Sequence, residues 1–599
     1  MSAWISAGRV DERSIIAPGH QHGDLEPSIK HRLPSSHHRP IAANHLTHCK
    51  GDSRMPSSTK FTESYIPADK EGELIEKTLP ELMVEIAREV PDRLAIVEGV
   101  ADPAKRRRWT YKQLVDDAQK VARGLLTQLQ PGDKVALLAS ETPEWVIMQH
   151  GLCFAGLIIV PLNPAYTERE VEFVVRNSEA SAIVFGETAR GKDLRKVVEA
   201  VKARLPNLKS TICISDIEAL KAAGDPAREL PKQSPTQTMQ IQYTSGTTGF
   251  PKGACLHHRG VINASYLIAS RAKFPEGGVW INSMPMFHIG GSVVSELGTF
   301  SRKGTFVLMQ SFDPGLFLEL IEAERCNNAL IVPTMILALL NHPDLKKRDL
   351  SSFNSILSGA SAVPASLVRR ATQEFDCQFC IMYGQTEANG AFMETLTTDP
   401  VELQSETVGR PIPHVEVKLV NPETLKTVPV GTVGEFWVRG FSTMAGYYGN
   451  PEATKAALTE DGWLRTGDLG TMDENGYFRI TGRLKEMIIR GGMNLYPKEI
   501  EEVLIGHPGV AQVAVAGLPD PTWGEIVGAA VMAKDPKNPP SADELHQYCR
   551  ANLMPQKTPE KWFFVDQFPM TATGKIQKNV LLEMVREGKI KPVDWTRPK

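Results

Sequence analysis

The sequence predicts an α/β fold with a large N-terminal body of parallel-sheet α/β subdomains, a small β-barrel, and a smaller α+β C-terminal domain. Short apolar runs of strand length, such as 134–139 and 182–185, alternate with helical stretches in the first part of the chain. This alternation indicates parallel sheets that helices cover on both faces. After about Gly409 the pattern changes to strict alternation between Pro/Gly turns, as in 415–420, which is typical of antiparallel strands.

The individual elements follow from the hydrophobic periodicity. A helix is predicted from residue 79, where apolar residues recur at helical spacing, and further helices at 144–155 and 541–553. Apolar runs too short for helices predict further strands at 157–160, 211–214, 239–243, 329–332, 355–357, 434–439, 511–516 and 526–533. The last two strands and the last helix form the predicted α+β end of the chain.

The first residues differ from the rest of the chain. Residues 1–54 hold seven of the 15 histidines, scattered prolines and no sustained apolar period. Such a segment cannot bury enough apolar surface to offset the entropy lost on ordering, so we predict a disordered N-terminal extension over residues 1–64. The spacing of its histidines fits no metal-ligand template. The remainder is predicted to divide into a body at 65–482 and a C-terminal domain at 483–599.

Composition narrows the class of protein. The 67 basic and 70 acidic residues leave a net charge of −3, which argues against a nucleic-acid partner bound through bulk phosphate neutralisation. The longest apolar stretch, near 152–162, is too short for an integral membrane segment. Eight scattered cysteines suit a reducing compartment. The predicted location is cytoplasmic, with mitochondria or peroxisomes as alternatives because targeting signals are weak; a homo-oligomer stays open.

The most informative segment runs from Tyr243 to Gly253 and reads Tyr-Thr-Ser-Gly-Thr-Thr-Gly-Phe-Pro-Lys-Gly. It follows a predicted strand and is expected to lead into a helix. Its glycines let the backbone approach a ligand closely, while its hydroxyls and its lysine suit a polyphosphate. It is not a Walker A loop, because the Gly-Lys-Ser/Thr order is absent. Nucleotide contacts are therefore predicted for Thr244, Ser245, Gly246, Thr247, Thr248, Gly249, Phe250, Pro251 and Lys252.

Further motifs follow in the chain. They read Pro-Met-Phe-His-Ile-Gly-Gly (285–291), Tyr-Gly-Gln-Thr-Glu (383–387), Trp-Leu-Arg-Thr-Gly-Asp (463–468), Gly-Arg-Leu-Lys-Glu-Met-Ile-Ile-Arg-Gly-Gly (482–492) and Pro-Met-Thr-Ala-Thr-Gly-Lys (569–575). In this order, and with the glycine-rich segment, they resemble the acyl-adenylate-forming enzymes. This superfamily includes acyl-CoA synthetases, aryl-CoA ligases, beetle luciferases and the adenylation domains of peptide synthetases. The resemblance covers about residues 65–590 and is closest to AMP-forming medium-chain acyl-CoA synthetases (fatty-acid:CoA ligases).

The resemblance implies contacts to the nucleoside. Asp468 can accept hydrogen bonds from both ribose hydroxyls, and Arg483 can donate to them. Tyr383 would supply a flat face for adenine. Close backbone approach on the other side of the base is expected from Gly359, Ala360 and Ser361.

Other matched residues would perform the chemistry. A carboxylate and ATP repel each other, so their charges must be screened before the acid can attack the α-phosphorus. Glu387 is the candidate Mg²⁺ ligand, because Mg²⁺ prefers one or two carboxylates together with phosphate oxygens and waters. Thr386 could donate to the α-phosphate. Lys575 is expected to stabilise the charge on the five-coordinate phosphorus. His288 stands at the entrance of the predicted acid pocket and is the fourth catalytic candidate.

A mobile C-terminal domain is also implied by the resemblance. In the family this domain rotates after adenylation, which removes the lysine and presents another face for thioester formation. Lys485 matches the hinge, where a polar residue absorbs the backbone change. Gly491 and Gly492 would then let the pantetheine thiol of CoA approach.

The predicted function is that of an ATP-dependent acid:CoA ligase. It would activate a small-molecule carboxylic acid, a medium-chain fatty or related apolar acid, through an acyl-adenylate, and would use ATP, Mg²⁺ and coenzyme A. Enzymes that activate α-amino acids carry an aspartate near the position of His288, and this chain does not, which argues for a substrate without an α-amino group. The alternative is a free-standing adenylation enzyme that loads a carrier protein in trans. A luciferase-like reaction and an inactive scaffold are weaker alternatives.

Overall fold

The structure is a computed structural model that describes residues 60–599, except for 190, 245–250, 360–362, 571–574 and 596–599. The predicted disorder of residues 1–59 therefore falls outside the described residues. Residues 60–64, which the prediction places in the extension, are hydrogen-bonded to the body. The amide of Phe61 donates to the carbonyl of Glu474 at 3.0 Å, and the amide of Ser64 to that of Val428 at 2.9 Å.

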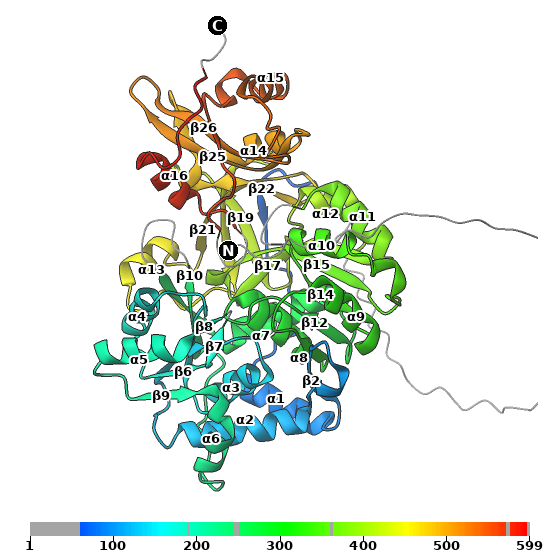
Figure 1. The fold of residues 1–599 in the computed structure, drawn as a ribbon, viewed down its shortest axis with the longest axis vertical. Coiled ribbons are helices and arrows are strands. Elements are labelled where there is room, and N and C mark those ends of the chain that lie inside the picture. Colours follow the sequence, from blue (N-terminus) through cyan, green and yellow to red (C-terminus); the bar gives the residue numbers. More distant parts are fainter. Residues whose placement is uncertain (1–59, 190, 245–250, 360–362, 571–574, 596–599) are drawn as a thin grey trace, which may run out of the picture. The chain divides into compact units, whose positions relative to one another are not determined.

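A nine-stranded mixed sheet forms the centre of the body (Figure 1). In spatial order it contains β18 (Arg410–Pro411), β17 (Gly390–Glu394), β16 (Gln378–Gln385), β15 (Ser355–Gly359), β14 (Asn328–Leu330), β12 (Val279–Asn282), β13 (Thr305–Leu308), β2 (Leu94–Glu98) and β3 (Arg108–Thr110). The strands from β16 to β2 are parallel, and the pairs at both edges are antiparallel.

A second sheet carries the glycine-rich segment. In spatial order it contains β11 (Lys252–His257), β10 (Thr238–Thr244), β5 (Ile158–Pro161), β4 (Lys134–Leu138), β6 (Ala182–Phe185) and β9 (Ser210–Cys213). All these strands are parallel except β11, which is antiparallel to β10. The expectation that the glycine-rich segment leads into a helix is therefore wrong. Small and apolar residues after Lys252 extend the sheet by one strand before the next helix begins.

Two smaller sheets follow in the chain. The predicted small antiparallel unit contains β1 (Tyr65–Ile66), β19 (Val415–Val420), β20 (Gly434–Gly440), β21 (Leu464–Met472) and β22 (Phe478–Arg483). The C-terminal sheet contains β24 (Met493–Leu495), β23 (Ile488–Arg490), β26 (Gly524–Ala533), β25 (Val510–Asp520) and β27 (Lys561–Phe564). The predicted strands at 415–420, 511–516 and 526–533 lie within these sheets. The short strands β7 (Thr188–Ala189) and β8 (Lys192–Asp193) pair with each other in a separate two-stranded sheet.

Helices fill the connections between the strands. They are α1 (Leu79–Glu89), α2 (Tyr111–Leu125), α3 (Pro143–Phe154), α4 (Glu168–Asn177), α5 (Leu194–Arg204), α6 (Ile217–Ala223), α7 (His258–Arg271), α8 (Glu296–Ser301), α9 (Pro314–Glu324), α10 (Pro333–Leu340), α11 (Ala365–Phe375), α12 (Val401–Glu406), α13 (Pro451–Ala457), α14 (Pro497–Ile505), α15 (Ala542–Asn552) and α16 (Lys578–Arg586). Reciprocal capping boxes begin α1, α2, α4 and α15. None of the helices in the described ranges is long and apolar enough to cross a membrane.

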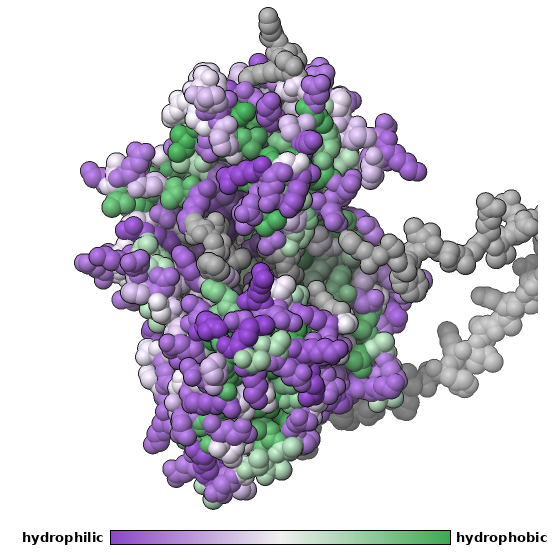
Figure 2. All heavy atoms as spheres, turned by 60° about the vertical axis from the view of Figure 1, so that its left-hand side comes forward, coloured by the Kyte–Doolittle hydropathy of each residue, from purple (hydrophilic) through white to green (hydrophobic). Residues whose placement is uncertain are grey.

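Both faces of the nine-stranded sheet are covered, as the sequence predicts. Ile356 and Phe379 point to one face and pack with the buried residues of α9, α10 and α11. Their chain neighbours Leu357 and Cys380 point to the other face and pack with α3, α7 and α8. The period of two along each strand produces this division. On the outside of the protein, hydrophilic side chains cover most of the face in Figure 2, with apolar residues scattered among them.

One acidic side chain is buried in this sheet. Glu394 on β17 is 1 % exposed, and among the described residues its carboxyl oxygens have no hydrogen-bond partner beyond the nearby thiol of Cys380. Burial raises the pKa of Glu394 to about 8, although the guanidinium of Arg271 on α7 opposes this shift. The carboxyl group is therefore largely protonated at neutral pH.

Glu394→Gln should remove a pH-dependent loss of stability. The pKa of Glu394 is about 8 in the folded state and about 4.3 in an unfolded chain. The wild-type protein therefore loses free energy of unfolding, on the order of 3–5 kcal/mol, as the pH rises from about 4.5 to above 8. Urea unfolding of both proteins at about pH 5 and about pH 8.5 should show the variant gaining relative stability at the higher pH. An identical pH dependence in the two proteins would contradict the buried, protonated carboxyl group.

Candidate active site

The described part of the glycine-rich segment lies at one end of the β10–β11 hairpin. Thr244 and Lys252 are opposite each other in the strand register, and Pro251 precedes the second strand. The ammonium of Lys252 lies 5.2 Å from the centroid of the Tyr447 ring. The remaining predicted phosphate contacts, Ser245, Gly246, Thr247, Thr248, Gly249 and Phe250, lie outside the described residues.

The predicted Mg²⁺ ligand sits on a short turn, Thr386–Ala388, directly after β16. The hydroxyl of Tyr447 donates to Glu387 Oε1 at 2.8 Å, and burial raises the pKa of that hydroxyl, so it stays a donor. The neighbouring Thr386 is only 8 % exposed. In the described parts of the chain no three His, Cys, Asp or Glu side chains are grouped to hold a metal. Glu387 thus offers one carboxylate, which fits Mg²⁺ bound mainly by phosphate oxygens and water.

The predicted ribose contacts form one connected group. Asp468 on β21 is opposite Arg483 on β22, and Arg483 Nε lies 3.0 Å from Asp468 Oδ1. The hydroxyl of Tyr383 donates to Asp468 Oδ2 at 2.7 Å. The charge of Asp468 raises the pKa of Arg483. Each oxygen of Asp468 keeps a second lone pair, so the carboxylate can still accept from a ribose hydroxyl.

Tyr383 is more deeply packed than a simple stacking platform would be. Its ring centroid lies 5.0 Å from that of Phe392 and 5.4 Å from that of Phe436, and the residue is 9 % exposed. A stacked adenine would have to use this small exposed part. The hydroxyl bond to Asp468 is a second role that the sequence pattern did not indicate.

Gly359 ends β15 where only a glycine fits. A Cβ added there would lie 2.6 Å from the carbonyl oxygen of Met382 on the neighbouring strand. Packing between strands therefore requires this glycine, and its predicted approach to adenine stays a prediction. Ala360 and Ser361, which complete the predicted adenine contact, are outside the described residues.

His288 is held in its neutral form. Its Nδ1 accepts a hydrogen bond from the amide of Gly290 at 3.1 Å, so the ring proton resides on Nε2. Burial, with a smaller contribution from the Lys575 ammonium, lowers the pKa of His288 to about 4. The side chain therefore carries no charge at neutral pH.

The pKa of Lys575 depends on two of the residues predicted to bind the nucleoside, Arg483 and Asp468. The residue as a whole is exposed, whereas its ammonium is enclosed enough for burial to lower its pKa. Arg483 lowers the pKa of Lys575 further, and Asp468 opposes the shift. The Lys575 ammonium also contributes to lowering the pKa of His288, so its charge acts on residues from three separate motifs.

The predicted hinge is tied to the lysine segment. Lys485 is exposed within the short turn Leu484–Glu486. Its neighbour Glu486 accepts from Lys578 Nζ at 3.0 Å, and the same ammonium lies 2.7 Å from Glu501 on α14. Lys578 follows Lys575 by three positions, so this pair of contacts fixes the segment after Lys575 to the residue next to the hinge.

The two glycines that are predicted to let CoA approach form a tight hairpin turn between β23 and β24. Gly491 and Gly492 have φ angles of 55° and 81°, which favour glycine. A Cβ on Gly491 would lie 2.8 Å from the Trp523 ring, and the Arg490 guanidinium is 5.1 Å from the centroid of that ring. Trp523 is nevertheless 48 % exposed. The sequence reasoning missed it, although a tryptophan in a Pro/Gly turn is an available signal.

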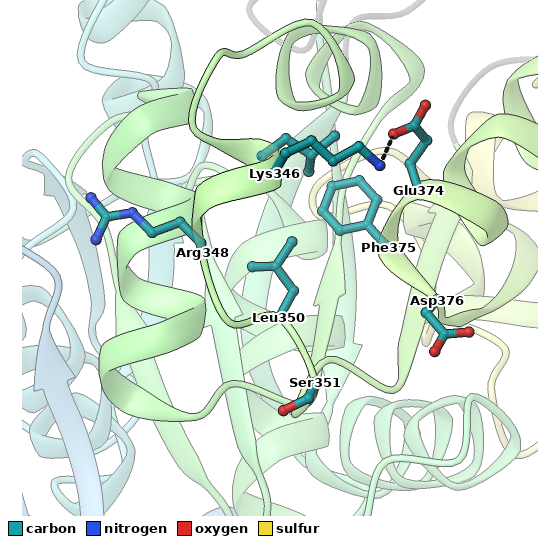
Figure 3. A pocket seen from close by; sticks show the side chains of 8 residues that line it. Lys346, Arg348, Leu350, Ser351, Glu374, Phe375 and Asp376 are labelled. Atoms are coloured by element: carbon teal, nitrogen blue, oxygen red, sulfur yellow. Dashed lines mark ion pairs between the residues drawn. The ribbon is translucent and has the colours of Figure 1, made fainter. Parts of the chain in front are cut away.

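A surface pocket lies away from these residues. It has a volume of about 380 Å³, and its rim carries the ion pair of Lys346 with Glu374 at 2.5 Å (Figure 3). Its lining residues Ser351 and Asp376 precede β15 and β16, whereas Gly359 and Tyr383 lie toward the other ends of the same parallel strands. Sites in parallel sheets form at the carboxyl ends, so this pocket is not part of the candidate site.

Comparisons with known proteins agree with the motifs. The AMP-binding enzyme family matches residues 84–448, and the AMP-binding enzyme C-terminal domain matches residues 499–575. The chain belongs to the AMP-binding enzyme family. The predicted superfamily, its fold class and the predicted enzyme class, an AMP-forming acyl-CoA ligase, are confirmed.

Three similar proteins illustrate the family. Putative acyl-CoA synthetase YngI of Bacillus subtilis is 37 % identical over 545 residues, which cover 86 % of this chain and 98 % of that protein. Medium-chain acyl-CoA ligase ACSF2, mitochondrial, of Bos taurus is 32 % identical, with 88 % and 90 % covered. The crystal structure of ATP-bound MatB from Rhodopseudomonas palustris superposes with a TM-score of 0.77 at 30 % identity and covers 85 % of this chain and 99 % of its own.

Asp468→Asn should weaken ATP binding without unfolding the enzyme. The substitution keeps the size of the side chain but removes the charge that Arg483 and Tyr383 contact. Hydrogen bonds to a charged group contribute about 1.5–3 kcal/mol, so we expect ATP affinity to fall by about 10- to 100-fold in calorimetry. Arg479→Gln is the control, because Arg479 lies on β22, the strand of Arg483, and pairs with Glu406 at the surface. Unchanged ATP affinity in Asp468→Asn would contradict the ribose assignment.

Proposed function

We propose that the enzyme activates an apolar carboxylic acid of the medium-chain fatty acid class and transfers it to CoA. The acid would attack the α-phosphorus of ATP, releasing pyrophosphate, and CoA would then displace AMP from the acyl-adenylate. The observation that carries this proposal is the anchor in which Asp468 pairs with Arg483 at 3.0 Å and accepts a hydrogen bond from Tyr383 at 2.7 Å. The charges of Arg483 and Asp468 also act on the pKa of Lys575. Such a site combines a cation for the reacting centre with an anchor for the ribose.

The proposed adenylation step depends on cations that screen the repulsion between the carboxylate and ATP. Lys575 would contact the oxygens that gain charge as the carboxylate attacks, while Glu387 would hold the Mg²⁺ of the Mg²⁺–ATP substrate. Lys252 and Thr244 would meet the phosphates, and Thr386 would donate to the α-phosphate. The lowered pKa of Lys575 reflects partial desolvation, which strengthens its interaction with a developing anion.

The surroundings of His288 support an apolar acid. A methyl group on Gly290 would lie 3.3 Å from His288 Nδ1 and 3.4 and 3.6 Å from the side chains of Met284 and Leu330, so the neighbours of this histidine are apolar. His288 is neutral, and the charge that reaches it is the cation of Lys575. A substrate ammonium would find no counter-charge in this set of residues. The relatives named as medium-chain acyl-CoA ligases support the same acid class.

The thioester step would use the C-terminal domain, proposed at 483–599 after a body at 65–482. Rotation about Lys485 would replace Lys575 with the Gly491–Gly492 turn at the site. Trp523 packs against Gly491 of this turn and is 48 % exposed, so it could contact the incoming CoA. The cytoplasmic location, its mitochondrial or peroxisomal alternatives, and a homo-oligomer stay predictions from the sequence.

A panel of acids tests the proposed substrate and acceptor. Pyrophosphate release should be fastest with medium-chain fatty acids, and slower with short hydroxy acids, arylalkanoates and sterol side-chain acids. CoA should accept the acyl group from the purified enzyme. Faster turnover of another acid class would overturn the substrate assignment, and transfer to a carrier protein but not to CoA would establish the alternative function.

Lys575→Ala should separate the two half-reactions. Loss of an ammonium at the reacting phosphorus costs about 3–4 kcal/mol, so the rate of acid-dependent pyrophosphate release should fall by about 10²–10³-fold. Thioester formation from supplied acyl-adenylate should proceed at the wild-type rate. The matched control is Lys589→Ala, because Lys589 is an exposed lysine of the same domain that pairs with Glu587. Wild-type adenylation by the Lys575 variant would show that the assignment is wrong.

A further inference from the structure

A short segment, 444–448, connects the two parts of the proposed Mg²⁺–ATP site. At one end the amide of Tyr448 donates to the carbonyl of Gly253 on β11 at 2.8 Å. At the other end the amide of Met444 donates to the carbonyl of Glu387 at 2.9 Å. The segment therefore bridges the strand after the glycine-rich loop and the turn that carries the predicted metal ligand.

Tyr447 lies at the centre of this segment and contacts both parts through its side chain. Its hydroxyl donates to Glu387 Oε1 at 2.8 Å. The ammonium of Lys252 lies over the face of its ring, 5.2 Å from the ring centroid. One side chain thus touches the only carboxylate assigned to Mg²⁺ and the lysine assigned to the phosphates.

These two contacts have different physical effects. A carboxylate can rotate about its last bond, and a hydrogen bond to one oxygen fixes that rotation and leaves the second oxygen aligned for a metal. Partners of this kind typically change metal affinity or activity by about 10- to 100-fold. The aromatic face attracts the ammonium without taking its hydrogen-bond donors, which stay available for phosphate oxygens.

We propose that Tyr447 is a positioning residue for Mg²⁺–ATP: its hydroxyl orients Glu387 toward the metal, and its ring holds Lys252 toward the phosphates. The inference rests on the proposed roles of Glu387 and Lys252. Tyr447 itself would touch neither the metal nor the reacting atoms. Its effect should therefore be visible in how strongly Mg²⁺ promotes ATP binding.

The adjacent residue provides a matched control. The hydroxyl of Tyr448 donates to Glu179, and the ammonium of Lys134 lies 5.0 Å from the centroid of the Tyr448 ring. This arrangement has the same chemistry as that of Tyr447, but its partners lie elsewhere: Lys134 begins β4, and Glu179 follows α4. If such a tyrosine only stabilised the fold, Tyr447→Phe and Tyr448→Phe should have equal effects on ATP binding.

Calorimetry of ATP binding with Mg²⁺ and with EDTA tests the proposal on the full chain. The Kd measured in EDTA divided by the Kd measured with Mg²⁺ gives the promotion of ATP binding by Mg²⁺. This ratio should fall by about 10-fold or more in Tyr447→Phe and stay unchanged in Tyr448→Phe. Tyr447→Leu should in addition weaken ATP binding in EDTA, because the ring over Lys252 is lost. In a Glu387→Gln background, Tyr447→Phe should change nothing further, since the two residues act through the same contact.

Three results would overturn the inference. They are equal effects of Tyr447→Phe and Tyr448→Phe, an effect of Tyr447→Phe that does not depend on Mg²⁺, and additive effects with Glu387→Gln. A melting curve of each variant confirms that the folded protein is compared. Failure of the proposed function is distinguishable, because the wild-type enzyme would then release no pyrophosphate with any acid while the binding comparison still gives its own answer.

Discussion

The repulsion between a carboxylate and a triphosphate is the constraint on which this site depends. In the proposed site few charges would meet it: Lys575 from the C-terminal part, Lys252 from β11 and Arg483 from β22. Asp468 pairs with Arg483, and Glu387 would hold the Mg²⁺. Each anion is itself held by a tyrosine hydroxyl, Asp468 by Tyr383 at 2.7 Å and Glu387 by Tyr447 at 2.8 Å. Such prior orientation lowers the reorganisation that the reacting charges would otherwise require.

Hydrogen bonds between distant segments keep these groups in register. Asn389 follows the turn Thr386–Ala388, which carries the proposed Mg²⁺ ligand and is called the metal turn below. Asn389 is fully buried and has a φ of 53°. Its side chain accepts from the amide of His257 at 3.2 Å and donates to the carbonyl of Ser442 at 2.8 Å. It therefore joins the metal turn to the end of β11 and to the segment that leads to Tyr447. A buried amide with both functions satisfied specifies one arrangement more strongly than apolar packing would.

Much of the fold was predictable because it depends on local periodicity. The alternation at Val415–Val420 and the short apolar run at Ala182–Phe185 were predicted with the observed bounds, since burial on one or both faces leaves a direct pattern in the residues. The strand β11 was missed, because the four small and apolar residues between Lys252 and His257 are also compatible with the start of a helix.

The sequence by itself determined the chemical groups and their order: the lysine, the carboxylates, the histidine and the glycines stand in short motifs whose residue types suit phosphate, metal and ribose. Only the tertiary structure decided which of them meet. The partnership of Tyr447 with Glu387 spans 60 positions and that of Tyr383 with Asp468 spans 85. No local period encodes such pairs, since the partners lie on separate elements that only the folded chain brings together. The same holds for Trp523: its place in a Pro/Gly turn is a signal in the sequence, but only the fold of β25 and β26 places it against Gly491.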